Sequence, residues 1–296
     1  MFDCLPHTSA EPCGCPTAHT ERKGEDMTDT TPENGGAHRG LGKLVDTVIG
    51  SPFAGILPWI VMSLFSGPGR FELSVAIAFA LSLGFLLISH RHSSHLKPME
   101  VFDLIFFALF FVLGYFVGHS GRTWLENWGG EISNVVLMLF VLITILVKQP
   151  FTMPYAKEST DPQYWDTPGF RHINYVISWA WFISFAIQTA MGYYAGAILA
   201  DTNEFWWGWA LPFAPMIAAI VFTEVYPDYA RGKARGENPS ALGFFEWIAP
   251  FALVCGAAGL ITDSIGTTVG VILIVGGAVV SGALNRRGKA RKATTA

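Results

Sequence analysis

Ionisable and amide side chains within apolar segments are the first candidates for chemistry in this chain, because such groups are costly in a bilayer. Asp103 and Glu100 lie in one apolar run, Glu224 ends another and Glu246 begins a third. Gln188 lies near the middle of an apolar run. One interpretation is a polar pocket near one membrane face, formed by Asp103, Gln149, Asn174, Gln188, Glu224 and Glu246. The alternative is that the carboxylates only begin or end helices, where a carboxylate at the N-terminus is favoured by the helix dipole.

Histidines form a second group of candidates. His90, His92 and His95 occur close together, and His172 is expected at the same membrane face. Imidazoles can bind zinc or copper, but the sequence favours a solvated loop that titrates near neutral pH, and we predict no metal site. Phosphate-binding glycine loops, His-Glu-x-x-His motifs and nucleophile elbows do not occur in the sequence. We therefore predict no catalytic residue and no cofactor. The sequence favours a non-enzymatic protein, and an enzyme acting at the inner leaflet through the histidine cluster is the less favoured alternative.

The composition indicates a protein surrounded by lipid. Hydrophobic residues make up 51% of the chain, charged residues only 14%, and the mean hydropathy is +0.39. A soluble domain has about 25% charged residues, because water must solvate its surface. The net charge of −4 gives no indication of a nucleic-acid partner. Membrane lipids are therefore the expected surroundings.

Apolar stretches close to the roughly 20 residues needed to span a bilayer recur along the chain. Backbone groups in lipid must be paired within the segment, so these stretches are expected to be helices. The sequence thus predicts an all-α transmembrane bundle over 46–285, with about eight spans arranged as four hairpins. Residues 1–45 are predicted to be a disordered cytoplasmic tail, in which Met27 is a candidate for the initiator methionine. Residues 286–296 are predicted to be a basic cytoplasmic tail. The expected spans are 52–67, 71–90, 100–118, 131–148, 173–197, 205–225, 243–262 and 265–284.

Lysine and arginine predict the orientation. Beyond the first predicted span, only Arg70 and Arg122 fall in loops on the outer side. Basic residues concentrate in cytoplasmic loops, so both termini are expected in the cytoplasm of a bacterium, and the chain in its inner membrane. The loops predicted to be cytoplasmic contain Arg39, Lys43, Arg91, Lys97, Lys148, Lys157, Arg171, Arg231, Lys233, Arg235, Arg286, Arg287, Lys289, Arg291 and Lys292.

Two returning helices end in similar segments. Residues 148–157 and 223–231 each contain a proline, then Tyr-Ala and a basic residue. We expect each proline to stop its helix and each base to meet anionic headgroups. A duplicated hairpin and shared interface physics explain the similarity equally well.

The connection 158–172 alternates aromatic and charged residues and is a candidate for docking a cytoplasmic or membrane protein partner. It contains Tyr164-Trp165 and continues through Phe170-Arg-His-Ile-Asn174. The Trp- and Phe-rich stretch 179–185 follows. This pattern resembles a connection between late spans of bacterial intracellular septation protein A. Residues 148–156 are similar to a stretch of an uncharacterised bacterial integral membrane protein family. The resemblance implies a role in the cell envelope and no catalytic residues.

Two functions follow as hypotheses. The first is a non-enzymatic membrane protein that organises partners or lipids of the cell envelope through its cytoplasmic loops. The second is a permease or channel for a small uncharged or lipidic substrate, in which Gln188, Asp103 and Glu224 line the route.

Overall fold

The computed structural model describes residues 55–65, 69–92, 97–201 and 204–295, which are helical apart from turns and short connections. Strands are absent from these ranges, so the predicted all-α class is confirmed. The tail 1–45, with Met27, lies outside the described residues. The helices are α2 (Leu57–Phe65), α3 (Phe71–His92), α4 (Pro98–Phe116), α5 (His119–Leu146), α6 (Met153–Glu158), α7 (Pro168–Tyr193), α8 (Leu211–Ala234), α9 (Ile248–Ile261) and α10 (Thr267–Thr295).

Six helices in the described part of the chain are long and apolar enough to cross a membrane. The protein is therefore a multi-pass membrane protein. Of the two other predicted spans, α2 has 9 residues. Helix α7 has 26 residues and is long enough, but Asn174, Gln188 and other polar residues lower its hydropathy. The six spans are Phe71–Arg91, Pro98–Phe116, His119–Leu146, Phe205–Ala234, Ala241–Ile261 and Thr267–Arg286.

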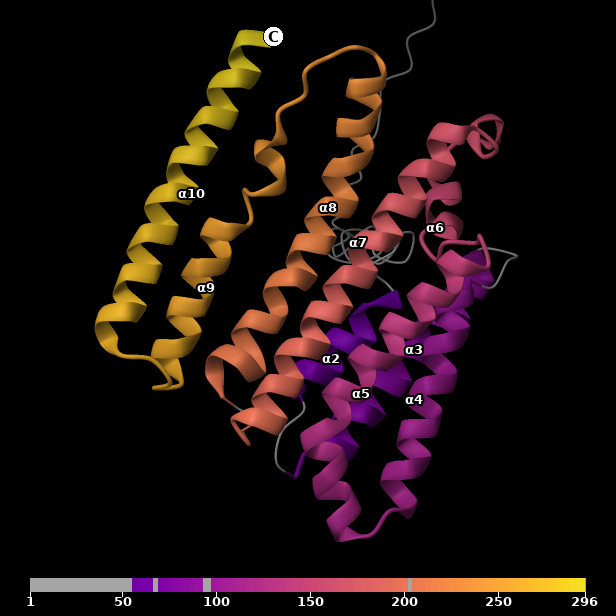
Figure 1. Ribbon diagram of the computed structural model, residues 1–296, viewed down its shortest axis with the longest axis vertical. Helices are drawn as coiled ribbons and strands as arrows, with labels where there is room; N and C mark the ends of the chain where they lie inside the picture. The colour runs from indigo at the N-terminus through magenta and orange to yellow at the C-terminus, as the bar shows by residue number, and fades with distance from the viewer. Residues whose placement is uncertain (1–54, 66–68, 93–96, 202–203, 296) are drawn as a thin grey trace, which may run out of the picture. The chain divides into compact units, whose positions relative to one another are not determined.

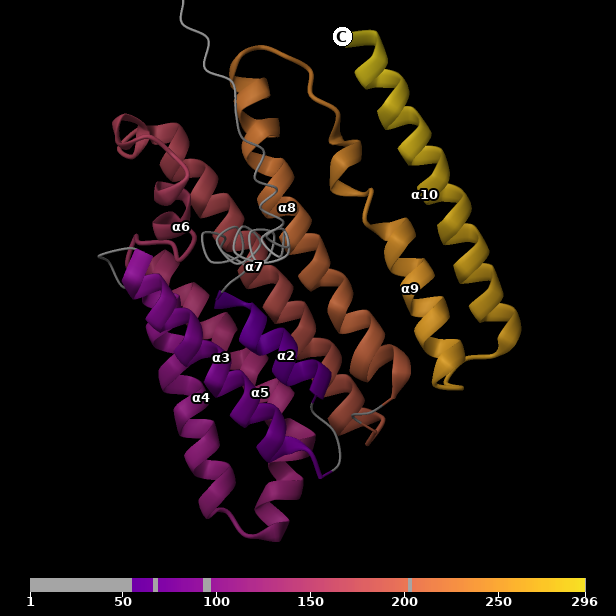
Figure 2. The ribbon, with the colours of Figure 1, turned by 180° about the vertical axis from the view of Figure 1, so that it is seen from behind.

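Consecutive long helices run in opposite directions, as the hairpin prediction requires (Figure 1). Helices α3 and α4 pack together, α7 packs between α5 and α8, and α9 packs on α10. The same pairs are seen from behind in Figure 2. We call the end where α3, α5 and α8 finish the basic end, because Arg91, Lys148 and Arg231 lie there. We call the other end, with the α4–α5 and α9–α10 connections, the far end.

Local sequence explains where α7 begins. Thr167 precedes Pro168, and the Thr167 Oγ1 accepts a hydrogen bond from the Phe170 backbone N–H at 3.3 Å. Proline at the first helical position and threonine at the cap are both favoured at a helix start. Helix α7 therefore begins before the predicted boundary at residue 173 and continues without interruption to Tyr193.

The two similar segments end their helices differently. Helix α5 stops at Leu146, and Lys148 takes a left-handed conformation with a φ of 61° before Pro150. Helix α8, in contrast, continues through Pro227 to Ala234, so the expected helix stop at Pro227 is wrong. The helix continues although the proline removes one backbone hydrogen bond, and next to it Tyr226 stacks on Phe222 with ring centroids 4.8 Å apart.

Glycines allow α9 and α10 to approach closely. A Cβ at Gly277 would lie 2.6 Å from the Ala249 carbonyl oxygen, and one at Gly256 would lie 2.8 Å from the Gly270 oxygen. Small residues serve such contacts in membranes, where packing rather than water exclusion holds helices together. Helix α10 continues to Thr295, through most of the predicted basic tail 286–296.

Candidate functional site

The structure separates the six residues of the predicted polar pocket. Asn174 and Glu224 line one cavity at the basic end, whereas Gln188 lines a different cavity toward the far end. Asp103 is buried away from both cavities. Gln149 and Glu246 are exposed at the basic end and line neither cavity.

The basic-end cavity lies between α6, α7 and α8 and has a volume of about 900 Å³. The two similar segments face one another across it, because Thr152 and Ala156 line one side and Thr223 and Ala230 the other. Thr152 Oγ1 donates to the Asn174 carbonyl oxygen at 3.2 Å, which joins the α5–α6 connection to α7. The cavity walls combine apolar surface with polar and charged side chains, among them Asp161, Glu224 and Arg231, which can orient a solute.

Tyr155 also lines the basic-end cavity, and its side chain is almost fully buried. Burial raises the pKa of the Tyr155 phenol well above its usual range, and the negative charges of Asp103, Glu100 and Glu158 raise it further. The phenol is therefore neutral at physiological pH and can donate a hydrogen bond.

The far-end cavity has a volume of about 390 Å³ and lies between α2, α5, α7, α8 and α9. Its polar lining includes Glu126, Glu131, Asn134 and Gln188. Gln188 Nε2 donates to the Ser184 Oγ at 3.1 Å, which fixes the amide at the inner end of the cavity.

Two π-helical segments contribute to the wall of the far-end cavity. Ala195 belongs to η3 (Tyr194–Ile198), and Phe205, Gly208 and Trp209 belong to η4 (Phe205–Ala210). Short π-helical segments occur frequently at functional sites, because they shift side chains out of helical register.

Glu131 is the residue of this cavity that sequence reasoning missed. The predicted fourth span begins at residue 131, so Glu131 was expected at a membrane surface, but α5 begins at His119. The Glu131 carboxylate lies against Gly192, where a Cβ would overlap it. Its Oε2 atom is buried and has no hydrogen-bond partner among the described residues. Glu131 and Asn134 are three residues apart on one helix face, which is the sequence signal for this site.

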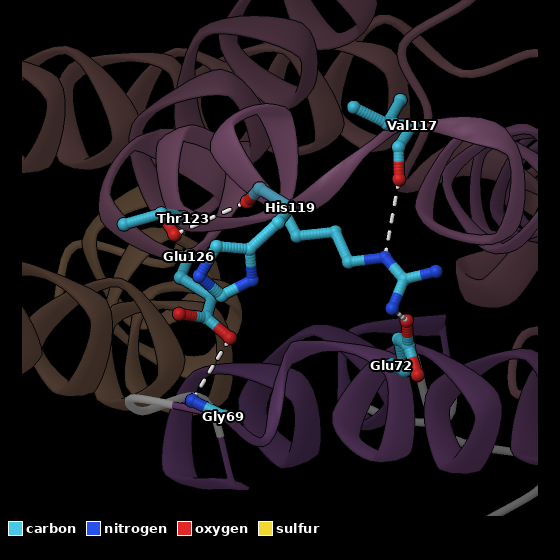
Figure 3. Close-up of polar contacts among 7 residues, drawn as sticks. Gly69, Glu72, Val117, His119, Thr123 and Glu126 are labelled. Carbon is cyan, nitrogen blue, oxygen red and sulfur yellow. Dashed lines mark hydrogen bonds and ion pairs between the residues drawn. The ribbon is translucent and has the colours of Figure 1, made fainter.

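Polar contacts near Glu126, a residue that lines the far-end cavity, are drawn in Figure 3. Glu126 Oε1 accepts a hydrogen bond from the Gly69 backbone N–H at 2.9 Å. Arg122 Nη1 lies 2.8 Å from Glu72 Oε1, and its Nε donates to the Val117 carbonyl oxygen at 3.1 Å. These contacts join the start of α5 to the start of α3.

A packed layer of side chains separates the two cavities. Trp181, Phe185 and Ala219 are each at most 3% exposed. The Trp181 Nε1–H donates to the Thr223 Oγ1 at 3.0 Å, so α7 and α8 are joined within this layer. We call Trp181, Phe185 and Ala219 the barrier layer, and Thr223 lies at its edge and lines the basic-end cavity.

Asp103 belongs to a buried cluster at the basic end. The Trp59 Nε1–H donates to Asp103 Oδ1 at 2.8 Å, which fastens α2 to α4. Lys97 Nζ lies 2.8 Å from Glu158 Oε2 and 3.8 Å from Glu100 Oε1. A buried carboxylate with an indole donor has a structural role in this arrangement, because it satisfies both polar groups.

The histidines do not come together in the described part of the chain. His90 is exposed at the end of α3, and His172 is exposed at the mouth of the basic-end cavity. His95 and the side chain of His92 lie outside what the structure describes. Among the described residues, no group of three or more histidine, cysteine or acidic side chains is placed to hold a metal ion.

No protein-family model matches this chain. No curated protein and no solved structure shows significant similarity to it. The function must therefore be argued from the geometry of its own residues.

Proposed function

We propose that this protein is a permease for a small solute. The observation that carries the proposal is the pair of cavities at opposite ends of α7 and α8, separated by the barrier layer. A carrier must offer its substrate a site from each side of the membrane without leaving a continuous opening. Two cavities closed from each other by one packed layer meet that requirement.

The barrier layer is thin compared with a membrane. On α7 the innermost lining residues are Ile177 and Gln188, which at 1.5 Å per residue are about 16 Å apart along the helix. On α8 they are Met216 and Thr223, about 10 Å apart. The hydrocarbon core is about 30 Å thick, so small movements of α7 against α8 suffice to connect one cavity to the other.

The proposed topology has about eight spans, with α2 and α7 completing the six that are long and apolar enough to cross a membrane. Residues 52–54, 66 and 67 of the first predicted span lie outside the described residues. Both termini and the basic end face the cytoplasm in this proposal, and the membrane is the bacterial inner membrane. The permease hypothesis keeps Gln188 and Glu224 on the route, but not Asp103, because its burial with Trp59 separates it from both cavities.

Side-specific thiol labelling tests the proposal. Asn134→Cys in the far-end cavity and Thr223→Cys in the basic-end cavity are made in a variant whose four natural cysteines are replaced. A membrane-impermeant maleimide should label Asn134→Cys faster from the periplasmic side and Thr223→Cys faster from the cytoplasmic side. Labelling of both positions fastest from the same side would remove the basis for a permease.

A second candidate function is the envelope-organising role implied by the resemblance to septation protein A. It is favoured by Tyr164, which is 51% exposed on the connection 158–172. The backbone of this connection is held by Trp165, whose Nε1–H donates to the Thr160 carbonyl oxygen at 2.8 Å. Tyr164→Ser should then reduce capture of a membrane partner in a cross-linking pull-down, and unchanged capture would exclude a role for Tyr164.

A further inference from the structure

The far-end cavity has an unbalanced set of charged side chains. Glu126 and Glu131 line it, and no lysine, arginine or histidine does so among the described residues. The nearby cation Arg122 is paired with Glu72 and does not line the cavity. A cavity with carboxylates and no basic group of its own favours a solute that brings a positive charge.

Glu131 is the carboxylate placed to meet that charge. Glu126 already accepts a backbone hydrogen bond from Gly69, whereas the buried Oε2 of Glu131 has no hydrogen-bond partner among the residues that the structure describes. The absence of a side chain at Gly192 provides the space in which the Glu131 carboxylate lies. A buried oxygen without a partner costs free energy, and a ligand that pairs with it recovers that cost.

The far-end cavity also has an aromatic wall. Phe205, Trp209 and Phe213 line it at intervals of four residues, with neighbouring ring centroids 5.6 Å and 5.4 Å apart. Aromatic faces attract organic cations through their quadrupole, most strongly when water is excluded. An inorganic ion would gain less from such a wall, because it prefers a shell of oxygen ligands.

Trp209 and Phe213 also line an apolar groove of about 390 Å³ between α8 and α9. The groove therefore adjoins the far-end cavity through these two rings. An apolar group attached to the cation can extend along this wall, where its burial is favourable.

From these contacts we infer that the far-end cavity binds a small organic cation, whose ammonium head pairs with Glu131 and whose apolar part packs on Trp209 and Phe213. The inference rests on the proposed permease and names its substrate class. It replaces the uncharged or lipidic substrate expected from sequence, because that expectation did not include Glu131.

Binding of tritiated benzyltrimethylammonium to the purified full chain tests the inference. Wild type should bind it saturably, and its neutral isostere neopentylbenzene should compete at least about tenfold more weakly. Glu131→Gln should weaken binding by about tenfold or more, because the charge at the head is lost. Glu246→Gln, the matched acid-to-amide change at an exposed residue that lines neither cavity, should leave affinity within about twofold.

Gly192→Ala gives a second measurement, because it keeps the Glu131 charge and displaces the carboxylate. It should also weaken binding, whereas Gly84→Ala, which has open space around its Cβ, should not. Absence of saturable binding to wild type, equal competition by neopentylbenzene, or unchanged affinity in folded Glu131→Gln and Gly192→Ala would each overturn the inference. Thiol labelling from opposite sides would still support the permease in those cases, so the two proposals fail separately.

Discussion

Glu131 combines three properties that distinguish it from the other acidic residues of the described chain. It lies well inside a long apolar helix, it lines a cavity, and one of its oxygens has no hydrogen-bond partner within the described ranges. Asp103 is more deeply buried, but its Oδ1 accepts the Trp59 indole hydrogen bond. A carboxylate with a partner stabilises a structure, and one without a partner inside a cavity is placed to bind a ligand.

Tyr155 gives a prediction about pH. Its pKa in the folded protein is raised by burial and by nearby negative charges, whereas the unfolded phenol has a pKa of about 10. The stability that depends on the neutral phenol is therefore complete below pH 10 and decreases above it, by up to about 1.4 kcal/mol per pH unit. Thermal unfolding in detergent should show that Tyr155→Phe loses less stability than wild type between pH 8 and pH 11.

The exposed Tyr164 provides the control for Tyr155. Tyr164 is 51% exposed, and Tyr164→Phe should follow the wild-type dependence on pH. If Tyr155→Phe and wild type lost stability in parallel above pH 10, the phenol would ionise as readily in the folded state as in the unfolded one.

Candidate residues were predictable only in part, for physical reasons. Apolar runs and their interruptions identified Asp103, Asn174, Gln188 and Glu224, all of which lie at buried or cavity-lining positions. Their grouping into separate sites depends on which helices pack together, and no local pattern encodes it. Glu131 was missed because the apolar run that predicts this span covers only 131–148, whereas α5 begins twelve residues earlier at His119.

At the scale of elements, hydropathy predicts the helices better than turn residues predict their ends. Pro150 follows the end of α5, but Pro215 and Pro227 lie inside α8. Proline removes one hydrogen-bond donor in either case, and the packing of the whole helix decides whether the helix continues. Such packing is a tertiary property that spacing in the sequence does not reveal.

The α9–α10 hairpin gives a prediction at this scale. In Gly277→Ala the new Cβ would contact the Ala249 carbonyl oxygen and the Leu253 backbone, so the helices must separate. We expect destabilisation of roughly 1–3 kcal/mol, measured by thermal unfolding in detergent. Gly276→Ala is the control, because nothing lies within 4 Å of its Cβ. Equal stability of the two variants would contradict close packing of α9 on α10.

At the scale of the whole molecule, the basic end contains most of the cationic residues in the connections between helices. Only Arg70 and Arg122 lie at the far end of the described chain. Alternating helix direction and the charge distribution therefore support one topology, because basic connections resist translocation across the membrane.

Reporter fusions test that topology. Fusions after residues 120 and 200 should report the periplasm, and a fusion after residue 235 should report the cytoplasm. If all three reported the same compartment, the alternation of helices across the membrane would be wrong.

The proposed transport requires the barrier layer to open, and cysteine labelling at the buried Ser184 measures that opening. Ser184 is 3% exposed and lies on α7 between Trp181 and Phe185, at a level between the two cavities. In a variant without the natural cysteines, Ser184→Cys should react slowly with an impermeant maleimide from either side of native membranes. Ser82→Cys on α3, equally buried but lining neither cavity, should stay unreactive. Absence of labelling at Ser184→Cys from both sides would contradict a permease built around α7 and α8.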